Sequence, residues 1–509
     1  MKDNRKLFYI VLIIIFIGLF VRFYALDMDS FSSKTYDVSW WDEGAYMHSA
    51  RTKALFGEWQ QENDSWNPLY MSPIGSYLTY WSYLLLGVGT FSTRIVPALL
   101  SFIAVIVSSI LIYRKDRLQG LIFMILSMTN VMLVAYSRLS MLEYLVIMFE
   151  LLIIGLMMNN KNISWFIIGL IIPCFVFVKM TSVFIMLALP LSLLLYYLLR
   201  KNRAYLKKLI ILIVGSIISS ILWLIFWVIP QFNQIIGSNS YLGTRAALSL
   251  GKFNALVYHT SKFILINPLL ALFFVIGIIS ISKRVISKSN FTFMELFIIT
   301  TSSLFLIQSI IVDYALRRLV LLIPVIILLA TFVITSIGNF DFSYRTKKIN
   351  FDKKKIIFII ISICLIINLC HFMPYFSRLK TEWDHHSSIK DASIEIGNII
   401  PEGAFVYSAD AVSLSKDNKI RPYYSYPGIG YANLDEKMLS MMKSGKINYG
   451  ILRYDIFNPG NLEKNDIHFA PNSEILLYMQ DDFKLIHIIY ARYTKYDPTD
   501  QEYYIYQKK

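Results

Sequence analysis

The sequence predicts a polytopic α-helical membrane protein that carries a soluble α/β domain at its C-terminal end. The chain of 509 residues is 56% hydrophobic and 16% charged, with a mean hydropathy of +0.53. Soluble domains usually carry about 25% charged residues. A membrane-spanning helix needs roughly 20 mostly apolar residues, and such runs recur up to residue 373. The remaining tail, 374–509, has a mixed and more polar composition.

Eleven membrane-spanning helices are expected from these apolar runs. They are 7–25, 95–113, 119–136, 141–158, 163–178, 182–199, 209–229, 263–281, 293–312, 319–337 and 356–373. The stretch 74–88 is also apolar, but its several Tyr and Trp residues favour a helix lying in the membrane interface, with a twelfth span as the alternative. The first span is long and no small-residue cleavage site follows it, so the N-terminus is not predicted to be a signal peptide.

The distribution of Lys and Arg predicts the orientation. The N-terminus and 114–118, 159–162, 200–208, 282–292 and 338–355 hold 21 of the 49 Lys and Arg residues and only four acids. The net charge of these segments is +17, and that of the whole chain is +15. We therefore expect these segments to be cytoplasmic, in a multi-pass protein of the plasma membrane. The basic charge reflects topology and does not indicate nucleic-acid binding.

The opposite, external side then receives the loop 27–94, the turns near 137–140, 179–181 and 313–318, the loop 230–262 and everything after 373. The chain divides into a membrane domain, 1–373, with 27–94 as its first external loop, and an external α/β domain, 374–509. In the tail, "SSIKDASIEIGNII" and "LDEKMLSMMKSG" are predicted helices. "PEGAFVYSAD", "KINYGILRYD" and the alternating end of the chain are predicted strands. The three cysteines lie in or near spans and provide no external disulfide framework.

This topology places several ionisable side chains at one level on the external side, in or beside tight turns between apolar spans. Ionisable groups are costly at such positions unless they are paired or hydrated. Carboxylates and cations at one depth indicate an anionic ligand together with acid–base chemistry. The residues are Asp42, Glu43, Arg138, Glu143, Lys179, Arg317 and Arg318.

Simpler interpretations remain open for most of these residues. "SWWD" fits a capping box in which Ser39 is the N-cap and Asp42 the N3 residue. Arg317 and Arg318 could be snorkelling ends of a span, although positive residues are otherwise scarce on that side. Lys179 sits in "FVFVKMTSVFIM" with few groups to solvate it, which favours a bound anion or a carboxylate partner. Glu150 lies deeper on the helix of Glu143 and is expected to serve packing.

Other site classes have little support. No zinc or EF-hand spacing is present, and whether the protein needs a metal is open; Mg or Mn held by carboxylates of the first external loop is one alternative. His48 is a single histidine in that loop. Neither a P-loop nor a GxGxxG motif after a strand occurs, so nucleotide-driven chemistry has no support.

Four segments, in order, resemble the GT-C-fold glycosyltransferases of family 39, the protein O-mannosyltransferase and aminoarabinose-transferase type. "WWDEGAYMHSAR" resembles the Asp-Glu-x-x-Tyr element of the first external loop and includes Tyr46. "SPIGSYLTYWSYLLLGVGTFSTRIVPALLSFIAVI" resembles the segment that follows, in which Arg94 opens a span. "AYSRLSMLEYLVIMFELL" resembles the Ala-x-Arg-x-x-Met-x-Asp/Glu element, and "DYALRRLVLLIPVIILLA" the Arg-Tyr-x-x-x-x-x-Pro element.

The chain departs from the family pattern in two places. Met71-Ser72-Pro73 stands where relatives often have Lys-Pro-Pro, so a cation that they use is missing. The Arg-Tyr element reads Arg317-Arg318. Lys179 or Arg317 is the expected substitute for the missing cation.

The resemblance implies inverting transfer of a sugar from a polyprenyl-phosphate donor to an acceptor at the external face. It implies Asp42 as the base, with Glu43 orienting it or holding a metal. Arg138, Lys179, Arg317 and Arg318 would bind the donor phosphate. Tyr46, His48, Arg94 and Glu143 would support the site. The sugar, the carrier length, the acceptor and the oligomeric state stay open.

Two other classes of function compete with sugar transfer. A transporter or flippase for a lipid-linked glycan should have broken helices at mid-membrane and related halves, and the sequence predicts neither. A membrane scaffold whose external tail binds a partner would leave Lys179 and the Asp42–Glu43 pair unexplained.

Overall fold

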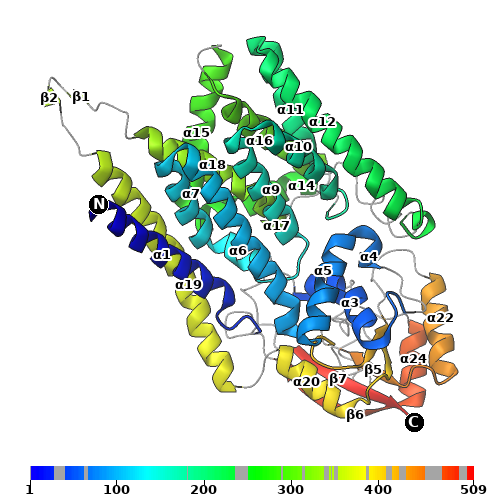
Figure 1. Cartoon of the computed structure of the whole chain (residues 1–509). Coiled ribbons are helices and arrows are strands. Elements are labelled where there is room, and N and C mark those ends of the chain that lie inside the picture. The colour runs from blue at the N-terminus through cyan, green and yellow to red at the C-terminus, as the bar shows by residue number, and fades with distance from the viewer. Residues whose placement is uncertain are drawn as a thin grey trace.

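The computed structural model describes residues 2–27, 40–61, 67–179, 182–235, 250–287, 291–311, 316–337, 343–344, 347–348, 353–385, 389–407, 415–423, 432–452, 473–491 and 501–509. These residues form a bundle of apolar helices with a smaller, sheet-containing domain at one end (Figure 1). The predicted fold class, a polytopic helical membrane protein with a C-terminal α/β domain, is confirmed.

Seven of the described helices are long and apolar enough to cross a membrane, and each coincides with a predicted span. They are α6 (Thr90–Lys115), α11 (Val183–Arg200), α12 (Arg203–Trp223, continued by η3, Leu224–Val228), α15 (Pro268–Ile286), α16 (Phe293–Ile311), the continuous run of α17 (Leu316–Leu319), η4 (Val320–Leu322) and α18 (Ile323–Ile337), and α19 (Lys353–His385). The span expected at 263–281 begins instead at Pro268, because a separate helix, α14 (Leu250–Ile266), occupies the end of the expected external loop.

The other predicted spans also correspond to helices: one of 22 residues, one of 17, and two that are divided into shorter pieces. They are α1 (Lys2–Phe23), α9 (Glu143–Asn159), α10 (Asn162–Ile171) with η1 (Ile172–Phe175), and the pair of α7 (Arg117–Thr129) and α8 (Val131–Ser137). At 1.5 Å per residue, the 17 residues of α9 extend over about 26 Å. This is close to the thickness of a hydrocarbon core.

The span expected at 119–136 is broken, so the prediction of unbroken helices is wrong at this position. Helices α7 and α8 meet at Asn130 with a bend of 60°. The Asn130 side chain accepts a backbone N–H from the first turn of α8 and donates to Asn267 (2.8 Å). Arg22 donates to the carbonyl oxygens of Ser127 (3.1 Å) and Met128 (2.8 Å). Protein side chains thus satisfy the backbone groups that the break exposes, as irregular backbone at membrane depth requires.

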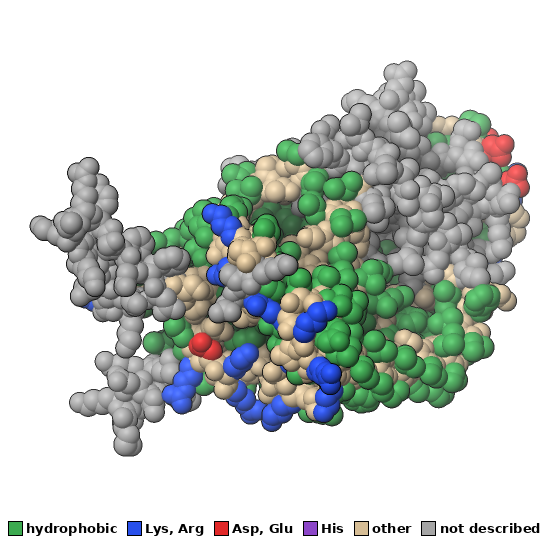
Figure 2. Space-filling view, turned by 90° about the horizontal axis from the view of Figure 1, so that it is seen from above, with side chains coloured by type: hydrophobic (Ala, Val, Ile, Leu, Met, Phe, Trp, Pro, Cys, Tyr) green, Lys and Arg blue, Asp and Glu red, His purple; other side chains and the backbone are tan. Residues whose placement is uncertain are grey.

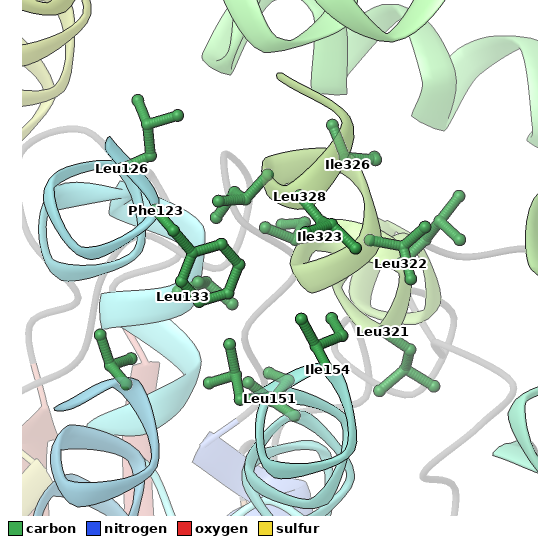
Figure 3. Close-up of a cluster of buried hydrophobic side chains, with 14 of the residues drawn as sticks. Phe123, Leu126, Leu133, Leu151, Ile154, Leu321, Leu322, Ile323, Ile326 and Leu328 are labelled. Atoms are coloured by element: carbon green, nitrogen blue, oxygen red, sulfur yellow. The ribbon is translucent and has the colours of Figure 1, made fainter. Parts of the chain in front are cut away.

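The broken pair lies in the centre of the helix bundle. Figure 3 shows apolar side chains from α7, α8, α9 and the η4–α18 segment pointing toward one another. Those labelled are Phe123, Leu126, Leu133, Leu151, Ile154, Leu321, Leu322, Ile323, Ile326 and Leu328. All ten are buried. This core fixes the C-terminal end of α8 beside the start of α9.

Basic side chains gather at the end of the bundle opposite the α/β domain. Figure 2 views this end and shows Lys and Arg side chains between apolar helix surfaces. Exposed members from the described segments expected to be cytoplasmic are Arg114, Lys115, Arg117, Lys161, Lys201, Arg203, Lys207, Lys283 and Lys355. The basic segments therefore share one end of the molecule.

Three helices of the first external loop lie between the bundle and the α/β domain (Figure 1). They are α3 (Trp40–Phe56), α4 (Pro68–Met71) and α5 (Pro73–Leu86). With 14 residues, α5 is about 21 Å long, too short to span a bilayer. Trp81, Leu84, Leu85 and Leu86 on this helix are exposed, and its location in the membrane interface stays a prediction.

The C-terminal domain is a five-stranded mixed sheet in the order β4-β3-β5-β7-β6. Its strands are β3 (Phe405–Tyr407), β4 (Arg421–Tyr423), β5 (Tyr449–Leu452), β6 (Phe483–Ala491) and β7 (Gln501–Lys508). Helix α20 (Ile389–Ile399) covers one face, and α22 (Ala432–Lys443) and α24 (Ser473–Asp482) contribute to the apolar core on the other. The predicted helices and paired terminal strands are present; β4 and α24 were not predicted.

Candidate active site

Helix α3 carries four of the five candidate site residues that the sequence places in the first external loop, Asp42, Glu43, Tyr46 and His48. Its backbone puts Asp42 in the first turn, directly before Glu43. The Asp42 side chain and the expected cap Ser39 lie outside the described residues, so the capping-box interpretation stays a prediction. Further along α3, His48 is buried and Tyr46 is partly exposed. The helix therefore presents Asp42 beside a carboxylate whose surroundings are well defined.

Glu43 is fully buried and binds two cations and a backbone amide. Arg94, near the start of α6, donates from Nε to Oε1 (2.9 Å) and from Nη2 to Oε2 (2.8 Å). The Nζ of Lys416 donates to Oε2, and the backbone N–H of Ser140 donates to Oε1 (3.1 Å). We call these four residues the Glu43 cluster. It joins α3, α6, the turn after α8 and the C-terminal domain at one point.

Two opposing effects set the protonation of Glu43. Burial alone would raise its pKa, but the charges and hydrogen bonds of Arg94 and Lys416 outweigh burial and lower the pKa to about 2. The carboxylate is therefore ionised at neutral pH. A paired Arg–carboxylate fork of this kind also fixes orientation, because both oxygens are held in one plane.

The stabilising effect of Glu43 should depend on pH. Since its pKa is lowered from 4.5 to about 2 in the folded protein, ionised Glu43 contributes stability above pH 4.5 and loses it as pH falls through 2. The difference in Tm between wild type and Glu43→Gln should be constant from pH 7 to about 5 and shrink below it. Thermal unfolding in detergent at a series of pH values measures this difference. A difference that does not change down to pH 3 would contradict the assignment.

A second ionic group, which we call the Glu143 cluster, begins three residues after Ser140. Glu143 starts α9 and is fully buried, and the Nζ of Lys179 donates to its Oε1. Arg317, in α17, is close enough to act on the same carboxylate electrostatically. Lys179 has a carboxylate partner, as one of its two interpretations predicted, and its side chain stays 13% exposed. Two expected site residues, Glu143 and Lys179, therefore pair, Arg317 acts on the same carboxylate from α17, and one short turn connects Glu143 to the Glu43 cluster.

Arg138 binds backbone carbonyl oxygens at the end of α1. The phosphate contact expected for it stays a prediction. The side chain is 3% exposed. Its Nη1 donates to the carbonyl oxygens of Val21, Arg22 and Tyr24, and its Nη2 to that of Ala25, at 2.9–3.1 Å. The last carbonyls of a helix have no partner within the helix, and a cation there also suits the helix dipole. In this structure the guanidinium closes the C-terminal end of α1.

Arg138→Met is therefore expected to lower stability. It leaves four backbone carbonyls at the end of α1 without their charged donor, which corresponds to about 3 kcal/mol. The expected result is a lower Tm in detergent, whereas Arg117→Met, which removes an exposed arginine at the start of α7, should change stability by less than about 0.5 kcal/mol. An unchanged Tm together with lost donor binding would return Arg138 to the phosphate site.

Arg318 is the remaining cation of the predicted set. It lies beside Arg317 in α17 and is partly exposed. The described residues contain no group of three His, Cys, Asp or Glu side chains arranged to hold a metal ion. The Asp42 side chain, Glu62 and Asp64 lie outside the described residues, so a metal held by carboxylates of this loop stays a prediction.

The sequence analysis missed the contribution of the C-terminal domain. Lys416 belongs to the segment Ser415–Ile420, which also contacts Arg51 and Thr90 on the membrane domain. Arg51 is 1% exposed, although the sequence predicts that it lies in an external loop. The only signal for these residues is their charge, and nothing in the sequence pairs residues so far apart.

Comparison with known proteins supports the fold. No family model and no curated protein sequence matches the chain. Among solved structures, the chain resembles ArnT from Cupriavidus metallidurans bound to undecaprenyl phosphate, with a TM-score of 0.59 and 12% identity over 97% of each chain. The apo structure of the same protein gives a TM-score of 0.58 and 13% identity over 98% of each chain. The chain therefore has the GT-C architecture over its whole length, including the C-terminal domain.

Proposed function

We propose that this membrane protein transfers a sugar from a polyprenyl-phosphate-linked donor to an acceptor at the external face of the plasma membrane. The observation that carries the proposal is the Glu143 cluster, where Lys179 pairs with Glu143 and Arg317 acts on the same carboxylate, one short turn away from the Glu43 cluster. Cations suit a phosphate at such a position. The fold shared with ArnT, crystallised with undecaprenyl phosphate, supports the choice of a polyprenyl carrier.

The reaction assigns one task to each group of residues. The acceptor hydroxyl oxygen attacks the anomeric carbon from the face opposite the phosphate, while Asp42 takes the hydroxyl proton. The bond between the anomeric carbon and the phosphate oxygen breaks, and the phosphate leaves with the electron pair. Lys179, Arg317 and Arg318 stabilise the negative charge of that leaving group. Glu143 pairs with Lys179 and directs it toward the site, and the Glu43 cluster orients α3.

An apolar groove offers a path for the polyprenyl tail. It has a volume of about 310 Å³ and lies between α11 and α12, with Ile172 at the end of α10 and Pro190 among its lining residues. Ile172 begins the short segment that leads to Lys179. A tail in this groove would place its phosphate near the Glu143 cluster.

Transport of a lipid-linked glycan is the second candidate function, and the break between α7 and α8 favours it. Transporters commonly bind substrates at discontinuous helices. Here, however, Arg22 and Asn267 already occupy the polar groups at the break. The same side chains would have to be displaced before a substrate could bind.

The two functions can be distinguished with purified full-length protein. We would incubate it with a panel of radiolabelled polyprenyl-phosphate sugars and cell-surface acceptors, and measure in parallel the flipping of the same lipids in liposomes. Transfer of label without flipping supports the proposal. Flipping with no transfer from any donor would replace it with transport. A tag at Lys509 that labels only from the cytoplasm would refute the external location.

A further inference from the structure

The segment Ser415–Ile420, which we call the docking segment, connects the C-terminal domain to the first external loop. Arg51 of α3 donates from Nε to the carbonyl oxygen of Ser415 (2.8 Å). Its Nη2 donates to the carbonyls of Asn418 and Ile420, each at 2.8 Å. One buried guanidinium on α3 therefore holds three backbone positions of the other domain.

The docking segment also binds the start of α6. Asp417 accepts the backbone N–H of Thr90 (2.8 Å) and the Thr90 hydroxyl (2.5 Å). A carboxylate at a helix N-terminus satisfies unpaired amides and suits the helix dipole. Two consecutive residues, Lys416 and Asp417, thus reach α3 and α6 respectively.

Lys416 is the member of this segment that enters the Glu43 cluster. Its side chain is 4% exposed and its ammonium group donates to Oε2 of Glu43. Arg94 binds the same carboxylate from α6. Within the described residues, Glu43 is therefore held between the membrane domain and the C-terminal domain, directly beside Asp42.

We propose that Lys416 is a positioning residue that fixes helix α3, and with it Asp42, through Glu43, so that the C-terminal domain completes the active site. This inference rests on the proposed function for the role of Asp42, but the contact between Lys416 and α3 does not. The C-terminal domain then contributes a residue to the active site itself, in addition to any role in binding the acceptor.

Loss of Lys416 should loosen α3 without unfolding the protein. Arg94 and the Ser140 amide still bind Glu43. Arg51, Asp417 and the ion pair of Lys390 with Asp27 (2.5 Å) still hold the two domains together. Because a displacement of about 1 Å at a reacting group can lower a rate by about 100-fold, the effect should appear in kcat.

Three single variants of the full-length protein test the inference. Lys416→Met removes the positioning charge, and Lys416→Arg retains it. Lys419→Met is the matched control, because Lys419 lies in the same segment but is exposed and pairs only on the surface with Glu402 (3.0 Å). Hydrogen exchange of the α3 amides and the kinetics of sugar transfer are measured on each.

In Lys416→Met, exchange in α3 should be about 10-fold faster and kcat about 30-fold lower, with the donor KM within about twofold of wild type. Lys416→Arg should recover most of both effects, and Lys419→Met should match wild type. Unchanged α3 exchange in Lys416→Met, or faster exchange with an unchanged kcat, would overturn the inference. If wild type transfers no sugar, the proposed function fails, while the exchange data still decide whether Lys416 holds α3.

Discussion

Replacing Asp42 by Asn is expected to lower kcat for sugar transfer by about 10³-fold and leave donor binding nearly unchanged. In the proposed reaction, Asp42 accepts the proton of the acceptor hydroxyl in the transition state. Positioned general bases typically contribute 10²–10⁴-fold. Asn retains the size and shape of Asp but cannot accept the proton. The ionic contacts of the adjacent Glu43 remain, so α3 should stay in place.

The measurement compares single-turnover transfer and equilibrium donor binding for wild type and Asp42→Asn. Glu58→Gln is a suitable control, because Glu58 is an exposed carboxylate shortly after the end of α3. It should transfer sugar at the wild-type rate. Full activity of Asp42→Asn beside an active wild type would exclude Asp42 as the base, and equal losses in both variants would point to a general effect of charge in this loop.

The membrane domain could be predicted from sequence because hydropathy is a local property. Each apolar run forms a helix, and short turns set the order of the bundle. The break at Asn130 could not be predicted in this way, since a single Asn in an apolar run scarcely alters hydropathy. What stabilises the break is Arg22 and Asn267, whose partners are 105 to 137 positions away. Local patterns contain no information about such pairs.

For the candidate site, too, the sequence predicts which residues take part but not which partners they bind. The cost of burying charge predicted that ionisable groups at these positions are paired or hydrated. This cost could not indicate which partner each residue has. Glu43 pairs with Lys416, 373 positions away, in a segment with no distinctive motif. Arg138 satisfies the backbone of α1, a need that becomes visible only when both helices are placed.

Lys179→Met should weaken donor binding by about 100-fold, the second large effect that we expect. Charge-assisted contacts to a phosphate are among the strongest polar interactions, and a hydrogen bond to a charged group contributes about 1.5–3 kcal/mol, which corresponds to about 10–150-fold in binding. The substitution has a second consequence, because Glu143 is fully buried and would lose its ion-pair partner. A defect in the single variant therefore does not by itself show that Lys179 touches the donor.

The double variant Lys179→Met/Glu143→Gln separates these two causes. It removes the lysine and the buried carboxylate together, so no uncompensated charge remains in place of the pair. If Lys179 served only to neutralise Glu143, the double variant should regain donor binding and stability. If Lys179 binds the phosphate, stability should recover while donor binding stays about 100-fold weaker. We expect the second result, because Arg317 also acts on Glu143. One carboxylate beside two cations leaves a net positive charge, to which the donor phosphate can bind.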